Sequence, residues 1–296
     1  MFENCSVMLI NENNSPIEIC KLELAADAQN KICRIFSDAT NEMRTNKTKL
    51  HFDGSYKPHK DEYLVIGNFQ LCDEIKDAVR NPIGVSSYVD KSGVFPSIKA
   101  IFVGKREENG NTEKFTISFQ RFRKEQRLTH PNGISIYFQN NTFVQETRFG
   151  INVSDIVDCC FDENELQFFS YYYARQVFDL SDYYRSATED EVIDFANNEK
   201  LTIQSVESFK ESANTWIRRK IAVINDSGVL KNYTASKIKS FAKAAGIDVK
   251  VVNKKILIPT DKEAVKIILG FLDEEAWKGP FSKKTFLANS KRVITN

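Results

Sequence analysis

The stretch I-K-A-I-F-V from Ile98 to Val103 and the stretch F-T-I-S-F from Phe115 to Phe119 together decide the fold class. Between them lies Asn109-Gly110-Asn111, which is typical of a tight turn. Further apolar or alternating runs, separated by similar turn residues, are Tyr63 to Phe69, Ile134 to Phe138, Thr142 to Thr147, Ile156 to Phe161 and Leu166 to Ser170. Because such connections are too short for the crossovers of parallel strands, the sequence predicts a mainly antiparallel sheet.

Helical periodicity lies on both sides of this sheet in the sequence. The segment P-I-E-I-C-K-L-E-L from Pro16 to Leu24 alternates as a half-buried strand does, and the apolar residues from Ala25 to Arg44 then recur three or four apart. Near Tyr171 the period becomes helical again. Thr188-Glu189-Asp190-Glu191 is a capping box, which predicts a helix that runs to about Asn198.

The last third of the chain is predominantly helical in pattern. The predicted elements are a long helical stripe from Val206 to Ile224, a helix from Ala235 to Ala245, a hairpin of Val249 to Val252 with Lys255 to Ile258, a helix from Asp261 to Leu272 and a strand from Thr285 to Thr295. The sequence therefore predicts an α+β protein. We expect an N-terminal domain over residues 1–200, with an acidic, aromatic helical end, and a small helical C-terminal domain with a β-hairpin over residues 201–296.

Charge is distributed unevenly along the chain. The net charge is only +1, from 41 basic and 40 acidic residues, but residues 151–200 carry −9 and residues 201–296 carry +9. Such a split is typical of proteins with one part that binds a polyanion. An alternative remains open, in which two solvated faces of opposite charge attract each other.

Cysteine usage and hydropathy indicate an intracellular protein. The six cysteines have no C-x-x-C spacing, and only three histidines could join them in a metal site, so we expect reduced, mostly buried thiols and no metal or other cofactor. The apolar stretches, such as Ile267 to Leu272, are far shorter than the ~20 residues that cross a bilayer. The N-terminus lacks the pattern of a secretory signal. These features predict a cytoplasmic location.

The basic residues of the C-terminal region form the best organised candidate site. In the helix from Ala235 to Ala245, one arc is apolar and the opposite arc carries Lys239, Lys243 and two serines, with Lys237 on the flank. The following hairpin tip carries Lys254 and Lys255. Further cations that we assign to the same predicted site are Arg218, Arg219, Lys291 and Arg292. This arrangement predicts phosphate contacts that do not depend on base sequence, although a merely solvated face has the same pattern.

Motifs for common enzyme classes are missing from the sequence. There is no G-x-x-x-x-G-K-[ST], G-x-G-x-x-G, H-E-x-x-H or G-x-S-x-G, which argues against the usual nucleotide, metalloprotease and serine hydrolase sites. One enzymatic alternative stays open, a metal-dependent nuclease that uses Asp226, Asp248 and Lys250. A turn acid and a solvent-facing lysine give the same pattern, so we expect a binding protein rather than an enzyme.

Two stretches carry a resemblance to a known family. F-D-E-N-E-L-Q-F-F-S-Y-Y-Y-A-R-Q-V-F-D-L-S-D-Y-Y-R-S-A-T from Phe161 to Thr188 is similar to the middle of KwaB-like proteins of the Kiwa anti-phage system. L-A-N-S-K-R-V-I from Leu287 to Ile294 resembles the Asn-Ser-Lys-Arg segment near their C-termini. The match places Asn289, Ser290, Lys291 and Arg292 in that motif.

The resemblance implies a DNA-binding defence effector that acts with a small membrane partner, KwaA, to limit phage replication. It also implies a homodimer and recruitment to the inner face of the cell membrane through the partner. The aromatic run from Phe168 to Tyr184 could stack bases, but its acidic neighbours favour packing in a core or a subunit interface. A scaffold whose basic face meets acidic headgroups or an acidic protein is a further alternative.

Overall fold

The computed structural model describes residues 1–11, 17–54, 56–89, 97–110, 112–128, 133–288 and 290–291. The chain forms two compact units. Unit 1 consists of Met1–Phe52 with Lys57–Leu180, and unit 2 consists of Asp53–Tyr56 with Ser181–Asn296. In the part of the chain that is described, no helix has the length and apolar character that a bilayer-spanning segment needs.

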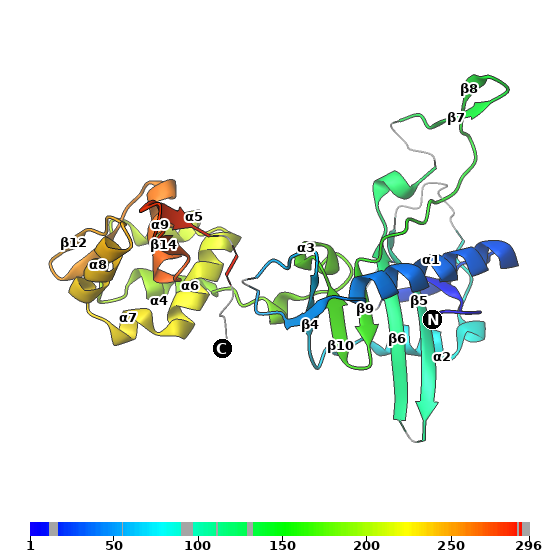
Figure 1. Cartoon of the computed structure of the whole chain (residues 1–296), viewed down its shortest axis with the longest axis horizontal. Helices are drawn as coiled ribbons and strands as arrows, with labels where there is room; N and C mark the ends of the chain where they lie inside the picture. The colour runs from blue at the N-terminus through cyan, green and yellow to red at the C-terminus, as the bar shows by residue number, and fades with distance from the viewer. Residues whose placement is uncertain are drawn as a thin grey trace. The chain divides into compact units, whose positions relative to one another are not determined.

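An eight-stranded sheet in the order β2-β1-β5-β6-β9-β10-β4-β3 forms the centre of unit 1 (Figure 1). Its strands are β1 (Val7–Asn11), β2 (Glu18–Lys21), β3 (Thr48–His51), β4 (Glu62–Ile66), β5 (Ile98–Asn109), β6 (Thr112–Arg121), β9 (Cys159–Asp162) and β10 (Glu165–Phe168). Neighbours pair antiparallel except β3 and β4, which are parallel. The predicted hairpin of Ile98–Val103 with Phe115–Phe119 is confirmed as β5 and β6, with Phe102 opposite Phe119.

Both faces of this sheet are covered. Helix α1 (Ala26–Arg44) runs across one face (Figure 1), where its Phe36 packs with Leu9 and Ile101. On the other face, α2 (Asp73–Arg80) packs against β5, and the rings of Phe102 and Phe178 both contact Phe119. Because both faces are covered, β5 and β6 carry apolar side chains at successive positions rather than at every second one.

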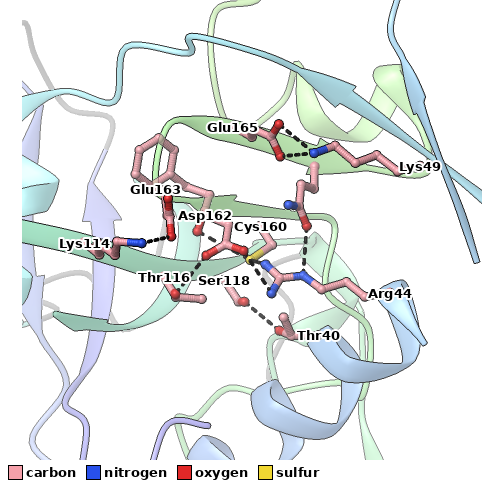
Figure 2. A network of polar contacts seen from close by, with 12 residues as sticks. Thr40, Arg44, Lys49, Lys114, Thr116, Ser118, Cys160, Asp162, Glu163 and Glu165 are labelled. Carbon is pink, nitrogen blue, oxygen red and sulfur yellow. Dashed lines mark hydrogen bonds and ion pairs between the residues drawn. The ribbon is translucent and has the colours of Figure 1, made fainter. Parts of the chain in front are cut away.

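A polar network fixes the end of α1 to the sheet (Figure 2). The guanidinium of Arg44 donates to Gln167 Oε1 at 2.8 Å and to Cys160 Sγ at 3.0 Å, and it pairs with the Asp162 carboxylate at 3.2 Å. One turn earlier, the Thr40 and Ser118 hydroxyls lie 2.6 Å apart. Since these groups are largely buried, the hydrogen bonds satisfy polar atoms that would otherwise oppose burial.

Smaller elements complete unit 1. They are α3 (Tyr171–Ala174), the 3-10 turns η1 (Pro82–Gly84) and η2 (Lys124–Gln126), and the two-stranded hairpin of β7 (Ile136–Gln139) and β8 (Thr142–Gln145). The sequence predicted the hairpin, β2, the strands of the sheet from β4 onward and α1. It missed β1, β3 and α2; β1 is buried along its whole length, so its side chains show no alternation.

Unit 2 consists of six helices, a turn and short strands around one core in the described residues. Its elements are η3 (Ser181–Tyr183), α4 (Glu189–Ala196), β11 (Leu201–Ile203), α5 (Val206–Ser212), α6 (Thr215–Ser227), α7 (Val229–Asn232), α8 (Ala235–Ala244), β12 (Val251–Val252), β13 (Lys255–Ile258), α9 (Lys262–Leu272), β14 (Ala276–Lys278) and β15 (Thr285–Leu287). β11 pairs parallel with β13, β12 pairs antiparallel with β13, and β14 pairs with β15. The core includes Phe195, Ile221 and Leu269.

The predicted single stripe from Val206 to Ile224 is wrong in one respect. The Asn214 side chain accepts a hydrogen bond from the Ile217 amide at 3.1 Å and starts a new helix, α6, so the stripe is divided into α5 and α6. Asparagine competes for backbone hydrogen bonds in this way, and apolar spacing does not reveal it. The predicted stop at Gly228 is confirmed, with a φ of 68°. The predicted last strand is found at Thr285–Leu287, and residues 289 and 292–296 lie outside the described residues.

None of the six cysteines, all of which are described, forms a disulfide. Cys20, Cys33, Cys159 and Cys160 are buried, and Cys5 and Cys72 are half-buried. Burial raises the pKa of all six thiols, to about 11 for Cys5, because it disfavours the charged thiolate. The prediction of reduced, mostly buried thiols is confirmed.

Candidate nucleic-acid interface

Helix α8 presents its lysines to solvent as its sequence predicts. The Thr234 hydroxyl accepts a hydrogen bond from the Lys237 amide at 3.3 Å and begins the helix, while Ala235, Ile238 and Ala242 are buried in the unit 2 core. The opposite side is exposed and consists of Ser236, Lys237, Lys239, Ser240 and Lys243. Hydroxyl and ammonium groups thus lie together on a helical face that has no part in the core.

A basic hairpin tip lies on the next elements of the same unit. Asn253 and Lys254 both have positive φ, 49° and 63°, which gives the tight turn between β12 and β13. Lys254 and Lys255 are exposed, and α8 packs against both strands (Figure 1). We call the exposed group Lys237, Lys239, Lys243, Lys254 and Lys255 the α8 basic surface.

The charges of the α8 basic surface are not neutralised within the described part of the chain. There, no carboxylate lies within ion-pair distance of Lys239, Lys243, Lys254 or Lys255. Other lysines of unit 2 do have such partners: Lys210 pairs with Glu189, and Lys266 pairs with Glu263 at 2.7 Å. A group of unpaired ammonium groups gives this side of the unit a positive potential.

Arg218 and Arg219 on α6 have partners inside unit 2. The Arg218 guanidinium donates to the Ala213 carbonyl at 3.1 Å and to the Ala187 carbonyl at 3.4 Å. Arg219 is buried, with its guanidinium 4.1 Å from the centre of the Tyr184 ring. Their assignment to a nucleic-acid site stays a prediction, and these contacts favour a role in holding α6 in place.

The C-terminal motif leads into a buried ion cluster. Lys291 donates to the Asp273 carbonyl and to its carboxylate, the latter at 2.7 Å. Asp273 also pairs at 2.5 Å with Lys220, which in turn pairs with Glu275. Lys220 is only 3% exposed. The charge of Lys291 is thus already matched within the unit, and its predicted phosphate contact stays a prediction; Ser290 has an interaction of its own, and Asn289 and Arg292 lie outside the described residues.

A comparison with known protein families matches residues 107–280, more than half of the 296, to the family described as Kiwa protein KwaB-like. The chain belongs to the KwaB-like family. Membership implies a role in Kiwa anti-phage defence. The matched range contains α8, the β12–β13 turn and therefore the whole α8 basic surface. No curated protein and no solved structure matches the chain.

All three residues of the nuclease alternative are exposed in this KwaB-like chain. Asp226 is paired with Arg185, with two oxygen to nitrogen distances of 3.1 Å. Asp248 and Lys250 are exposed on either side of Val249, just before β12. Over the described ranges, no group of three or more histidine, cysteine and acidic side chains is placed to hold a metal ion.

The aromatic run of the KwaB-like chain is mostly packed in unit 1. Phe168 is buried, Tyr171 stacks on Phe52 with ring centres 5.0 Å apart, and Phe178 contacts Phe69 and Phe119. Tyr172 and Tyr173 are exposed. Phe168, Tyr171 and Phe178 therefore serve the core, which is one of the roles that the acidic neighbours of the run indicated.

The sequence analysis missed one further group of residues in unit 2. β14 and β15 pair so that Trp277 lies opposite Phe286, and Phe281 lies between the strands with 96% of its surface exposed. The strand at β15 was predicted, but β14 has only three residues and leaves hardly any periodic signal, so the pairing of the two strands was not foreseen. The available signal was composition, because Ala276 to Asn296 contains no acidic residue and five basic ones.

Proposed function

We propose that this KwaB-like chain is a cytoplasmic defence effector that holds DNA through the α8 basic surface, without preference for base sequence and without cutting it. The observation that carries the proposal is the set of exposed lysines on α8 and the β12–β13 turn that lack carboxylate partners among the described residues. Phosphates bound there would release condensed counterions, which is the main source of sequence-independent affinity for DNA.

The shape of the surface suits a DNA backbone better than base edges. Lys239 and Lys243 are four residues apart, so both ammonium groups lie along one side of α8. Ser236 and Ser240 on the same side of the helix add uncharged donors, and hydroxyls commonly bind phosphate oxygens. Ammonium and hydroxyl groups together suit phosphate oxygens, and this supports binding without sequence readout.

A charge-neutralising variant tests the proposal. We expect Lys239→Gln, Lys243→Gln, Lys254→Gln and Lys255→Gln together to weaken binding to any duplex about equally and to flatten its salt dependence, because each lost phosphate contact lowers the slope by about 0.9. Affinity is measured by fluorescence anisotropy with several duplex sequences over a series of salt concentrations. Folding is checked by circular dichroism, since exposed substitutions change stability by less than about 0.5 kcal/mol.

The matched control removes the same charge from unit 1. Lys31, Lys57, Lys60 and Lys124 are exposed there, and their replacement by glutamine should leave the salt slope unchanged. Equal loss in both variants would mean that only net charge matters, and no loss in the first variant would remove the proposal.

The same mixtures with Mg²⁺ on a gel test the nuclease alternative: duplex cleavage that disappears in Asp248→Ala would replace binding alone as the function.

We also propose that the chain self-associates and acts with a KwaA-like membrane protein, which would bring it to the inner face of the membrane. Self-association is supported by the β7–β8 hairpin, whose Ile136, Phe138 and Phe143 are exposed. A two-stranded hairpin is marginally stable in water by itself, and exposed apolar groups of this kind mark protein interfaces. A second copy of the chain is the occupant that we propose for this hairpin.

A further inference from the structure

We propose that the β14–β15 hairpin of unit 2 binds unpaired DNA bases by stacking, so that the chain takes up single strands and opened duplex ends as well as intact duplex. This inference rests on the proposed DNA binding and adds a second, chemically different element to it. The α8 basic surface would hold phosphates, and the aromatic rings of the hairpin would hold the faces of bases.

The hairpin displays its rings on one side. Trp277 and Phe286 are directly opposite in the strand register, so both side chains lie on the same face, and their ring centres are 5.8 Å apart with 26° between the planes. They are 47% and 42% exposed. Phe281 in the connecting turn is almost fully exposed. Solvent-exposed aromatic rings on a small sheet are the element that proteins use to stack successive bases of a single strand.

The opposite side of the hairpin is fixed to unit 2. The Thr285 hydroxyl lies 3.2 Å and 3.3 Å from the carbonyl oxygens of Ala245 and Gly246, at the end of α8. A Cβ added to Gly270 of α9 would lie 2.7 Å from Leu287 Cδ1. The platform is therefore anchored to the residues that directly follow α8, the helix whose lysines we propose to bind phosphate.

The position of Phe286 is set by a close approach to backbone. A Cβ added to Gly279 would lie 2.7 Å from the Phe286 ring, so this ring fits only because residue 279 is glycine. The Gly279 amide and carbonyl also bond to Lys284 and Lys283, which closes the turn. A ring that is held in place loses little freedom on binding, and such preorganisation favours affinity.

Charge on the hairpin complements a nucleic-acid strand. Lys278, Lys283 and Lys284 are exposed, and no acidic residue occurs from Ala276 onward. Lys283 and Lys284 lie in the same turn as Phe281, and cations beside exposed rings fit a strand in which phosphates alternate with bases. A membrane surface is a different partner that basic and aromatic residues can meet, and the vesicle measurement described below distinguishes it from DNA. The hairpin is bonded to Ala245 and Gly246, directly after the helix that carries the proposed phosphate contacts, and this favours DNA.

The test uses the full chain and a short deoxythymidine oligonucleotide, which has no secondary structure of its own. We expect Phe281→Ala and Trp277→Ala each to bind it roughly five- to hundredfold more weakly than the original chain, the range expected for loss of one stacked base. Affinity for a blunt duplex of the same length should hardly change. Phe281→Trp keeps an aromatic ring at this position and should retain the affinity of the original chain for the oligonucleotide. The control Phe149→Ala removes an exposed ring from unit 1 and should have no effect.

A second measurement observes stacking directly. The chain has two tryptophans, so Trp216→Phe leaves Trp277 as the single fluorophore, and its emission should be quenched by the oligonucleotide. Unchanged emission together with unchanged affinity of the hairpin variants would overturn the inference while duplex binding still stands. A chain that binds neither duplex nor oligonucleotide would defeat the proposed function instead. Loss of binding to anionic phosphatidylglycerol vesicles, with oligonucleotide affinity retained, would assign the hairpin to a membrane and also overturn the inference.

Discussion

Lys220 is the central cation of a buried ion cluster in unit 2. Its ammonium group lies between the carboxylates of Asp273 and Glu275, which are each 4% exposed, and 5.4 Å from the centre of the Trp216 ring. Such a buried cluster need not stabilise a fold more than apolar residues would. Removal of one member is costly, however, because the remaining charges stay buried without compensation.

We therefore expect Lys220→Met to lower the free energy of unfolding of unit 2 by about 3–5 kcal/mol. Both tryptophans lie in unit 2, so a urea titration followed by tryptophan fluorescence reports on this unit. The exposed Lys262→Gln on α9 is the control and should change stability by less than about 0.5 kcal/mol. A Lys220→Met midpoint equal to that of the original chain would show that the cluster is not needed.

The ion cluster also shows what a sequence does not reveal at the scale of single residues. The partners of Lys220 lie more than fifty positions away, and neither Asp273 nor Glu275 belongs to a motif. Lys291 was predicted to contact phosphate because it is basic and lies in the segment that resembles the C-terminal motif of KwaB-like proteins. Only the packing of α6 against α9 brings these groups together.

Helix α4 is an element whose start was predictable in detail. The Thr188 hydroxyl accepts from the Glu191 amide at 3.2 Å, and the Glu191 carboxylate accepts from the Thr188 amide at 2.8 Å, as the capping box predicts. The structure adds Arg185, which pairs with Glu191 at 2.7 Å and also with Asp226 of α6. These hydrogen bonds, that from Arg185 first, lower the pKa of Glu191 to about 2.

This lowered pKa gives unit 2 a pH dependence of known sign. The carboxylate form stabilises the folded state, so the stabilisation is complete above the unfolded pKa of about 4.3 and is lost as the pH falls toward 2. We expect the urea midpoint of the original chain to fall more steeply than that of Glu191→Gln across this window. The exposed Glu211→Gln on α5 should keep the steep fall, and equal slopes in all three would contradict the prediction.

Elements with strong local signals were predicted well, and elements made by tertiary contacts were not. α8, α9 and the β12–β13 hairpin follow from apolar spacing, from caps and from the Asn253-Lys254 turn. The break between α5 and α6 depends on one asparagine side chain, and β14–β15 depends on anchoring to α8 and α9. For this reason the α8 basic surface was found in the sequence, and the aromatic hairpin was not.

At the scale of the molecule, packing and charge divide the chain at different places. The charge changes sign near Lys200, which is where we predicted the domain boundary. That boundary stays a prediction. By contacts the second unit begins at Ser181, because Val192 and Phe195 of α4 pack in the same core as α6 and α9. Four acidic residues of α4 thus belong to the unit that carries the basic surface. Composition along the chain cannot show which side chains meet in one core.

Self-association is the prediction that belongs to this scale. Phe138 and Phe143 form a pair on β7–β8, with 61% and 66% of their surfaces exposed and ring centres 5.2 Å apart. We expect Phe138→Ser with Phe143→Ser to reduce a dimer mass to a monomer mass in light scattering at micromolar concentration. The control Ile83→Ser changes an even more exposed apolar residue elsewhere in unit 1. A monomer mass for the original chain would contradict the proposal.

The full or partial burial of the six thiols makes the chain suitable for site-specific labels. Since the pKa of every native thiol is raised, little thiolate is present near neutral pH to react with maleimides or other alkylating probes. A cysteine introduced at the fully exposed position of Phe281 has no such protection. We therefore expect a single spin label or dye to attach selectively at that turn while the native cysteines are still present.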